Sequence, residues 1–435
     1  MKLKGKNMRK YFIALLMVAL LFVAACSNSG ETVTTATEAV TGSEETPTDA
    51  ATMDETTTED TTTPFTTAED PCQSFNLVDD VLLSPVNDQV PAVSDADLVT
   101  GPADAKYTFI TYSNFTCSHC ANLEPVLIAL QQLYPQDVRL VFRYVTTGSI
   151  STLSAQAVEA ANLQGKFAEM KDTIFAAQAT WWEFSDDEFR AWLDERATEF
   201  GMNVEQFNTD MDDENIANKI TYNRSLVDEL GITGTPTMFV NNRQYSPYQD
   251  RSIFTLATML RAMGISDQLL GDCPTVSTDF KDDLQAVIST TQGDIVVDLY
   301  EDQAPNTVAY FKYLADNGWY DNSDIFISTD EYIVSGDPSN SLYGGPGFVF
   351  YNEISEGTMD EEGLLVSFNQ LGTGYNSGLF MLTKGAVTDF SSDISIFGKV
   401  IEGLDVLSTL SDHPYSLDPA DWIYDSILSI TVQEK

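Results

Sequence analysis

Two cysteines separated by two residues constrain this chain more than any other feature. Cys117 and Cys120 follow an apolar run over 107–112 that predicts a buried strand, and they precede residues 121–133, whose apolar residues recur at helical spacing. A helix N-terminus places partial positive charge beside the first sulfur and so favours its thiolate. His119, which lies between the two cysteines, adds a second favourable charge when it is protonated. The pattern predicts a thiol–disulfide exchange site in which Cys117 attacks and Cys120 resolves the mixed disulfide.

Two other roles for the cysteine pair stay open at this point. One is half of a zinc site, but zinc takes four ligands, and a chain of five cysteines and two histidines offers no second ligand pair. The other is a purely structural disulfide, although so short a loop contributes little stability. We therefore expect neither a metal nor another cofactor.

Further sequence motifs extend over residues 100–264. They are Gly101-Pro102-Ala103-Asp104-Ala105, Cys117-Ser118-His119-Cys120, Glu124-Pro125-Val126-Leu127, a strand-like run over 138–143, Gly165-Lys166-Phe167 and a run over 231–241 that contains Thr235-Pro236. Through these motifs the segment resembles the DsbA-type branch of the thioredoxin superfamily. The resemblance implies that the bond between Thr235 and Pro236 is cis and lies against the cysteine pair, where its backbone holds a substrate peptide in extended form.

A helical insertion is predicted between the second strand and Thr235, from about 151 to 231, because apolar residues recur there at helical spacing. We expect Trp181 and Trp182 to pack in the small core of this insertion. A closing helix is expected over 251–263. With the alternating strands and helices around it, the insertion completes an α/β thioredoxin fold within residues 71–275.

The N-terminus has the pattern of a targeting signal. Residues 1–26 have a positively charged start, an apolar core and small residues before Cys26. They resemble the lipobox of bacterial lipoproteins, which implies that Cys26 is acylated and anchors an extracytoplasmic protein to the cell membrane. An uncleaved transmembrane anchor is the alternative, but the apolar run is shorter than the ~20 residues that a span needs. Residues 27–70, rich in Thr and acidic residues and free of Lys and Arg, predict a disordered tether.

The remaining cysteines, Cys72 and Cys273, bracket the thioredoxin-like segment. An oxidising compartment permits a structural disulfide between them, and the loop-entropy model assigns so long a closed loop up to ~5 kcal/mol of stability. The alternative is that these two cysteines relay oxidising equivalents to the Cys117–Cys120 pair. We expect the structural disulfide.

The chain is strongly acidic, with a formal net charge of -44. Nucleic-acid binding depends on basic contacts to phosphate, so this charge argues against a nucleic-acid partner. It argues equally against a protein that lies flat on an anionic lipid surface. A saline habitat and simple solubility explain the acidity equally well.

A second domain is expected over 284–435. Two strands joined by a Gly-containing turn begin it, a helix follows, and Gly-rich stretches with short apolar runs are typical of a barrel. This segment also contains five recognisable motifs: Ala304-Pro305-Asn306-Thr307, Gly318-Trp319-Tyr320, Ser335-Gly336-Asp337-Pro338, Gly344-Gly345-Pro346-Gly347 and the run 396–403. Through them the segment resembles the cyclophilins over essentially its full length. The resemblance implies an all-β cyclophilin-like barrel with a peptidyl-prolyl isomerase pocket.

The polar residues that carry isomerase chemistry in cyclophilins are replaced in this chain. The family's arginine donates to the prolyl nitrogen, but the corresponding segment is 325–329, and no arginine follows Arg261. The family's Gln-Phe-Phe stretch becomes Leu379-Phe380-Met381, which we expect to line an apolar pocket. Its Trp-Leu-Asp-Gly run becomes residues 389–392. Lys384 is the one candidate for a substitute donor.

Two interpretations of this domain follow from the replaced residues. One is a weak isomerase that relies on an apolar pocket to desolvate the amide. The other, which we favour, is a pseudoenzyme that binds extended or proline-containing segments and presents them to the thiol site.

These patterns together predict a membrane-anchored lipoprotein that catalyses thiol–disulfide exchange on extracytoplasmic proteins. Its expected partners are unfolded or cysteine-containing clients and a membrane redox partner that recycles the cysteine pair. Tethering an isomerase-like domain to the thiol site raises the local concentration of a client held by either one. The alternatives are a binding protein in which both domains are inert, and a thiol reductase that works in the opposite direction.

Overall fold

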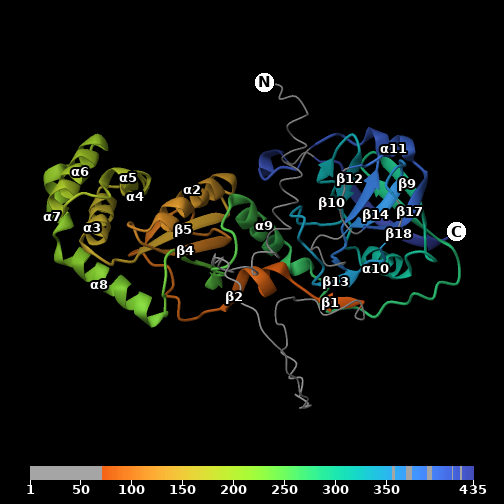
Figure 1. Cartoon of the computed structure of the whole chain (residues 1–435), viewed down its shortest axis with the longest axis horizontal. Helices are drawn as coiled ribbons and strands as arrows, with labels where there is room; N and C mark the ends of the chain where they lie inside the picture. The colour runs from red at the N-terminus through yellow and green to blue at the C-terminus, as the bar shows by residue number, and fades with distance from the viewer. Residues whose placement is uncertain (1–70, 355–357, 369–374, 389–393, 414, 422–423) are drawn as a thin grey trace, which may run out of the picture.

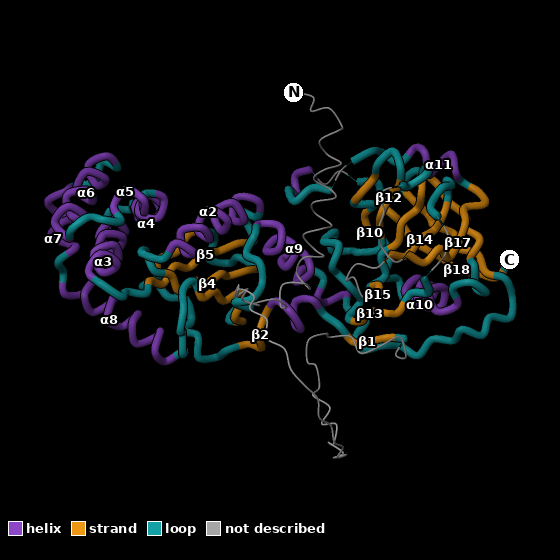
Figure 2. Tube along the Cα trace, in the orientation of Figure 1, coloured by secondary structure: helices purple, strands orange, loops and turns teal. Residues whose placement is uncertain are grey.

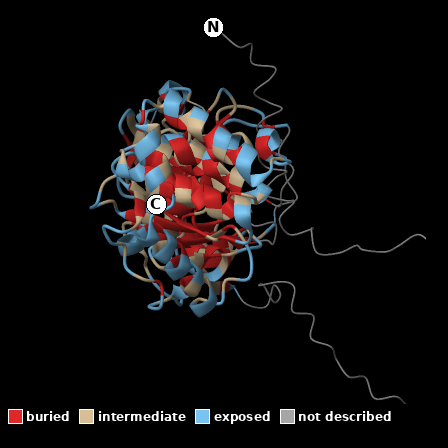
Figure 3. Cartoon of the chain, turned by 90° about the vertical axis from the view of Figure 1, so that its left-hand side faces the viewer, coloured by how far each residue is buried: buried red, intermediate tan, exposed pale blue. Residues whose placement is uncertain are grey.

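The computed structural model describes residues 71–354, 358–368, 375–388, 394–413, 415–421 and 424–435; the expected signal sequence, Cys26, the tether and residues 389–392 lie outside these ranges. The described residues form two halves that lie side by side (Figure 1). Buried residues fill the interior, and exposed residues cover the outside (Figure 3). Among the helices of the described ranges, none combines the length and the apolar character needed to cross a membrane.

The first half, which we name the thioredoxin half, is built on a six-stranded sheet with the order β2-β7-β6-β4-β5-β3. The bounds are β2 Leu83–Val86, β3 Leu98–Thr100, β4 Tyr107–Ser113, β5 Val138–Tyr144, β6 Thr237–Val240 and β7 Arg243–Tyr245. Strands β4 and β5 are parallel, and the other neighbours are antiparallel. A parallel pair needs a crossover, which α2 (Ser118–Leu133) supplies. The thioredoxin fold predicted from the sequence is confirmed.

One apolar cluster joins this sheet to α2 and to the closing helix α9 (Ile253–Gly264). The buried face of α2 presents Leu123, Leu127 and Leu130, whose spacing of three and four residues places them on one side of the helix. The short π-helix η1 (Leu77–Leu82) packs on the same cluster. The helix predicted over 121–133 is therefore present, but it begins earlier, at Ser118.

The predicted insertion consists of six helices at the outer end of the thioredoxin half (Figure 1). They are α3 Ser149–Leu163, α4 Phe167–Ala176, α5 Gln178–Trp181, α6 Asp186–Glu199, α7 Val204–Met211 and α8 Glu214–Glu229. Trp181 is buried and donates from Nε1 to the carbonyl of Ile174 at 2.9 Å. Trp182 is 63% exposed, so the expectation that both tryptophans pack inside is wrong for this one. Adjacent residues at the end of a helix point in different directions, and only one of them can face the core.

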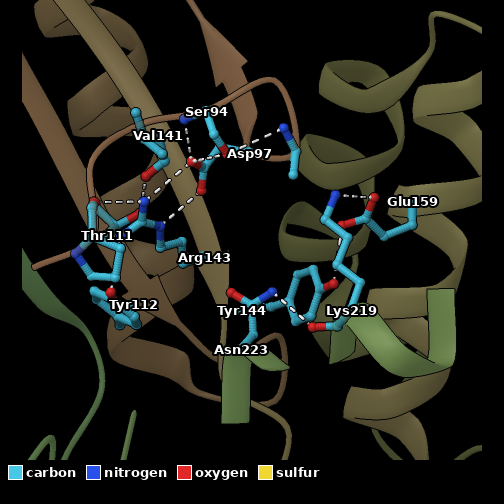
Figure 4. A network of polar contacts seen from close by, with 12 residues as sticks. Ser94, Asp97, Thr111, Tyr112, Val141, Arg143, Tyr144, Glu159, Lys219 and Asn223 are labelled. Carbon is cyan, nitrogen blue, oxygen red and sulfur yellow. Dashed lines mark hydrogen bonds and ion pairs between the residues drawn. The ribbon is translucent and has the colours of Figure 1, made fainter. Parts of the chain in front are cut away.

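A polar network ties the insertion to the sheet (Figure 4). The Tyr144 hydroxyl at the end of β5 donates to the buried carboxylate of Glu159 on α3 at 3.0 Å. Lys219 of α8 forms an ion pair with the same carboxylate at 2.6 Å. Burial raises the pKa of Glu159, although its partners Lys219 and Tyr144 lower it. Two helices of the insertion and one strand thus share a single buried acid, which fixes their relative orientation.

The second half, which we name the barrel half, contains a nine-stranded antiparallel sheet in the order β10-β18-β8-β9-β17-β14-β16-β12-β11. The bounds are β8 Leu284–Thr290, β9 Gly293–Leu299, β10 Ser323–Asp324, β11 Ile327–Ser328, β12 Tyr332–Ser335, β14 Leu364–Phe368, β16 Phe380–Thr383, β17 Ile394–Glu402 and β18 Ser426–Glu434, with helices α10 Pro305–Asp316 and α11 Leu404–Thr409. The sheet curls around an apolar core that α10 helps to fill (Figure 2). This all-β half-barrel agrees with the predicted cyclophilin-like fold.

The start of the described chain belongs to the barrel half. Strand β1 (Cys72–Ser74) pairs with β13 (Phe348–Tyr351), which in turn pairs with β15 (Tyr375–Asn376). The sequence assigned residues 71–275 to the thioredoxin-like domain, and the first strand of that range pairs with the barrel half. A three-residue strand held by backbone pairing carries too little side-chain pattern to reveal which sheet it joins.

The chain passes between the two halves near residue 75 and again near residue 270, and both segments bond to the loop before β13. The backbone amide of Phe75 donates to the carbonyl of Gly347 at 3.0 Å, and that of Leu270 donates to Pro346 at 2.8 Å. Gly347 has a positive φ of 101°, and a Cβ there would lie 2.6 Å from the carbonyl oxygen of Gly271. Only glycine permits this close approach of two backbones.

Candidate functional site

Cys117 occupies the N-cap of α2, directly after β4 and the turn that follows it. Its backbone is extended, with φ -94° and ψ 121°, and its carbonyl accepts the first helical hydrogen bond from Ala121 at 3.1 Å. The side chain is half-buried, and His119 beside it is exposed. The local pattern of strand followed by helix therefore brings a reachable sulfur to a helix N-terminus, as the sequence predicts.

The surroundings of Cys117 favour its thiolate. Burial raises the pKa of this thiol, but hydrogen bonds from the Thr235 side chain and from the backbone amides of Cys120 and His119 outweigh that cost, and the pKa lies below its ordinary value. The helix N-terminus supplies these amide donors because its first N–H groups have no partner within the helix. A group with this environment is a competent nucleophile near neutral pH.

Cys120 lies in the opposite environment. It is 1% exposed and packs in the apolar cluster that contains Phe115 and the insertion helices. Burial raises the pKa of its thiol to about 12, although the Asn114 amide approaches its sulfur at 3.4 Å. The two sulfurs are therefore unequal: one can be attacked from solvent, and the other is shielded.

The loop before β6 completes the site. The bond between Thr235 and Pro236 is cis, as the resemblance implies, and the thiol of Cys117 donates to the carbonyl of Thr235 at 3.3 Å. Thr235 is half-buried and Pro236 is buried. The structure thus brings Cys117, Cys120, Thr235 and Pro236 together, whereas His119 contributes its backbone amide and its side chain is exposed.

Two residues of the site were missed by the sequence analysis. Asn114 accepts from the Thr116 amide at 2.8 Å, donates to Thr147 and so shapes the turn before Cys117. An asparagine directly after a predicted strand favours an Asx turn, so the sequence did carry a signal for this residue. Gln178 donates from Nε2 to the carbonyls of Phe115 at 2.5 Å and Cys117 at 3.1 Å. It comes from the insertion, and no local pattern marks it.

A buried ion pair lies on the inner side of α2. Glu124 and Lys171 are 6% and 5% exposed and bond to each other, and the Lys171 ammonium also lies 5.9 Å from the ring centres of Phe142 and Phe167. Burial lowers the pKa of Lys171. The pair joins α2 to α4 and so links the thiol helix to the insertion.

The predicted isomerase pocket is divided between two sides of the barrel sheet. Leu379, Phe380 and Met381 are each at most 1% exposed. Phe380 points into the barrel core, whereas Leu379 and Met381 belong to a second apolar cluster. Neighbouring residues of a strand face opposite sides, so Phe380 is not part of a pocket wall, and this expectation is corrected.

The second cluster, which we name the isomerase face, is filled by its own side chains. Its members include Phe326, Val334, Val366, Leu379 and Met381, and each is at most 2% exposed. Tyr415 packs on it and lies edge-on to Phe326, with ring centres 6.5 Å apart. These five side chains are therefore buried in the structure and not exposed on an open pocket wall.

Helix α9 of the thioredoxin half reaches this same face. Arg261 is 6% exposed, and its guanidinium donates to the Tyr415 hydroxyl at 2.8 Å and to the carbonyls of Asn340 and Ser416 at 2.9 Å each. The ring of Phe254, on the same helix, lies 6.2 Å from that of Tyr415. The last arginine of the sequence thus joins the two halves.

Lys384 does not take the place of the missing arginine. Its ammonium donates to the Ser328 hydroxyl and to the carbonyl of Leu410, both at 2.9 Å, and lies 3.3 Å from Asp412. These partners hold the lysine at the end of the sheet. The proposed substitute donor is therefore already committed to structural contacts.

Comparisons with known proteins agree with both halves. A family model described as Thioredoxin matches residues 94–256, and one described as Cyclophilin type peptidyl-prolyl cis-trans isomerase/CLD matches residues 286–432. The Na(+)/H(+) antiporter NhaA 3 of Salinispora tropica is 34% identical over 164 residues, which are 37% of this chain and 24% of that protein. The chain spans about a quarter of the length of the first curated relatives that it matches.

Relatives of the barrel half are covered more fully. Peptidyl-prolyl cis-trans isomerase-like 1 of Neurospora crassa is 32% identical over 132 residues, which are 29% of this chain and 80% of that protein. Among solved structures, alpha-DsbA1 of Wolbachia pipientis is 21% identical with a TM-score of 0.35, covering 38% of this chain and 90% of that chain. A Cryptosporidium parvum cyclophilin is 25% identical with a TM-score of 0.32, covering 35% of this chain and 99% of that chain.

The fold and the thiol site define a thioredoxin-fold protein with a Cys-x-x-Cys pair, joined to a β half-barrel. More narrowly, the chain belongs to the cyclophilin-type family over its barrel half, and the segment before that half matches the Thioredoxin family model.

Proposed function

We propose that this protein catalyses thiol–disulfide exchange on client proteins outside the cytoplasm, through Cys117 and Cys120. The observation that carries the proposal is the inequality of the two sulfurs: a half-buried Cys117 with a lowered pKa beside a fully buried Cys120 with a raised one. Exchange needs such a pair because one sulfur must be reachable by a client and the other must resolve the mixed disulfide.

The favoured direction is oxidation of clients. A client thiolate attacks Cys117 in the Cys117–Cys120 disulfide, a mixed disulfide forms, and Cys120 leaves and takes up a proton. A second client thiolate then attacks the client sulfur of the mixed disulfide, and Cys117 leaves as a stabilised thiolate. Two electrons pass from the client to the protein. Stabilising the Cys117 thiolate stabilises the reduced form and so makes the disulfide more oxidising.

A measurement of the reduction potential tests this direction. The full chain carrying Cys26→Ser, with Cys72 and Cys273 left paired, is equilibrated with glutathione buffers. A value near that of strong oxidants, ~-120 mV, supports client oxidation, whereas a value near ~-270 mV, as in thioredoxin, points to a reductase. A pair that cannot be reduced and reoxidised leaves the inert binding protein as the better description.

The extracytoplasmic, membrane-anchored location is part of the proposal. It is supported by the disulfide between Cys72 and Cys273, the pairing expected from the sequence, because structural disulfides persist in oxidising compartments. Acylation of Cys26 would hold the protein at the membrane, where a redox partner could recycle the cysteine pair. Mass spectrometry of the purified protein tests the anchor: a diacylglyceryl group on Cys26 is expected, and an unmodified Cys26 contradicts it.

For the barrel half, we infer a platform without isomerase activity. The family's arginine is absent, the isomerase face is filled, and Tyr415 on that face is held by Arg261 of the thioredoxin half. This arrangement argues against presentation of proline segments to the thiol site. The arrangement also separates the thiol site from the isomerase face. Cys117 lies at the start of α2, and Tyr134 caps the other end of this helix, about 24 Å away. Tyr134 is the residue at that end that accepts a hydrogen bond from Arg261.

An isomerase assay decides this second point. The full chain is added to a proline-containing peptide whose cis form is cleaved slowly by a protease, and the expected rate equals that of the uncatalysed isomerisation. Clear acceleration that survives Cys117→Ser would restore the interpretation as a weak isomerase.

A further inference from the structure

The catalytic turn is held from the insertion by one amide side chain. Gln178 lies at the start of α5 and donates from a single nitrogen to the carbonyls of Phe115 and Cys117, at 2.5 Å and 3.1 Å. These carbonyls lie on either side of Thr116, directly before the helix that presents the reactive sulfur. No other residue of the insertion has a hydrogen bond to the 115–117 turn among those found in the described ranges.

The position of Gln178 is itself fixed. Trp181, three residues further along α5, is buried, donates to the carbonyl of Ile174 and packs on Phe189 with ring centres 5.2 Å apart. Residues three apart lie on the same side of a helix, so the anchored tryptophan directs the side chain of Gln178 toward the turn. The half-buried setting of Gln178 reduces competition from water.

The two carbonyl oxygens are negative ends of peptide dipoles beside a sulfur that must carry negative charge. An amide N–H that engages both oxygens keeps them oriented toward the insertion and partly neutralises them. It also holds the turn in the geometry in which the amides of His119 and Cys120 reach the Cys117 sulfur. Both effects favour the thiolate.

We propose that Gln178 is a positioning residue that sets the reactivity of Cys117, so that the insertion tunes the redox chemistry of the thiol site. The inference rests on the proposed exchange activity and deepens it. Gln178 touches neither a client nor a reacting sulfur; it acts through the backbone of the turn. It therefore changes how reactive Cys117 is, and not whether the cysteine pair can cycle.

The test compares Gln178→Met and Gln178→Glu with the wild type and with Gln164→Met, all in the full chain carrying Cys26→Ser. Gln164 is a matched control, because it lies in the same insertion and also donates to a backbone carbonyl, that of Asn203 at 3.2 Å. Thiolate absorbance against pH reports the ionisation of Cys117. Glutathione equilibration reports the potential, and thermal unfolding reports stability.

For Gln178→Met we expect the pKa of Cys117 to rise and its alkylation rate near pH 7 to fall about 3- to 10-fold, the effect of losing one ordinary hydrogen bond. The exchange equilibrium should move by the same factor, or ~15–30 mV toward a less oxidising pair. Gln178→Glu should exceed this effect, because it replaces the donor by an acceptor of equal length. Gln164→Met should leave the ionisation of Cys117 and the potential unchanged.

The failures of the two proposals can be told apart. If the wild type cycles between its redox states but neither Gln178 variant changes the ionisation of Cys117, the positioning role is overturned while the exchange function stands. If Gln178→Met does not fold, the isosteric Gln178→Glu decides. If neither folds, Gln178 is a folding residue and the proposal is wrong. If the wild type itself cannot cycle, the exchange function fails before any variant is compared.

Discussion

The thiol site and the isomerase face show two fates of a surface in one chain. At the thiol site, a half-buried sulfur is surrounded by donors from a helix N-terminus, a Thr-Pro loop and the insertion. At the isomerase face, the positions of the family's polar groups hold Leu379 and other apolar residues, and a tyrosine covers them. The first surface keeps polar groups accessible, whereas the second has become interior. The comparison teaches that a family's fold can be kept while apolar residues replace polar ones at one of its surfaces.

The largest effect is expected from Cys117→Ser. It removes the nucleophile, so disulfide transfer to a reduced client should fall to the uncatalysed rate, because the buried Cys120 cannot be reached by a client. Disulfide transfer to a reduced client protein measures this. Cys120→Ser is the matched variant: its Cys117 thiolate should attack a client that carries a disulfide, release the other client sulfur as a thiolate, and accumulate as a stable mixed disulfide because no second cysteine resolves it. If Cys117→Ser still transferred disulfides, the thiol site would not be the reactive surface of the chain, and its contrast with the isomerase face would be wrong.

The next effect concerns the covalent link where the two halves meet. The double change Cys72→Ala and Cys273→Ala removes the disulfide without leaving a free thiol, and we expect a loss of ~4 kcal/mol in the free energy of unfolding. The reason is that the unfolded chain without the disulfide has more conformational freedom, which favours unfolding. Urea unfolding of the double variant against the oxidised wild type measures it. An unchanged unfolding midpoint would mean that the disulfide does not stabilise the fold.

Removal of the guanidinium at the junction should have a slightly smaller effect. Arg261→Met leaves the carbonyls of Asn340 and Ser416 without this donor in a buried place, which we expect to cost ~3 kcal/mol. Hydrogen exchange of residues 410–413 and 415–416 should rise. Arg190→Met, which breaks an exposed ion pair, is the control. The isomerase assay should still show no acceleration, because undocking exposes Tyr415 but restores no catalytic arginine. Isomerase activity of Arg261→Met would mean that packing of Tyr415 on the isomerase face is what prevents the activity.

The smallest effect is a difference in pH response between the two sulfurs. The pKa of Cys117 is lowered, and that of Cys120 is raised to about 12. The rate at which iodoacetamide modifies Cys117 should therefore be half-maximal at a pH below the ordinary cysteine pKa of ~8.5. Cys120 should stay unmodified until a far higher pH. As the pH falls through the pKa of Cys117, the stabilisation of its thiolate is lost and the reduced form loses that advantage. Peptide mapping after alkylation at several pH values checks this. Equal modification of both sulfurs would contradict the inequality.

The sequence revealed the parts of this molecule that local patterns encode. Cys117 and Cys120 at a strand–helix junction, the Thr235–Pro236 loop and the alternating strands each depend on residues close in the chain. Gln178 and Arg261 escaped because a lone polar residue on a helix carries no mark of the distant carbonyl that it meets. The exposure of Trp182 and the pairing of β1 were missed for a related reason: the outcome depends on which surface arrives to cover them.

The pairing of β1 with β13 has a consequence for the order in which the molecule is completed. Synthesis delivers β1 first, whereas its partner strand emerges only after the whole thioredoxin half. A chain that stops before β13 contains both Cys72 and Cys273 but lacks the strand on which β1 docks. Pairing of β1 therefore has to wait until the chain has been made as far as β13.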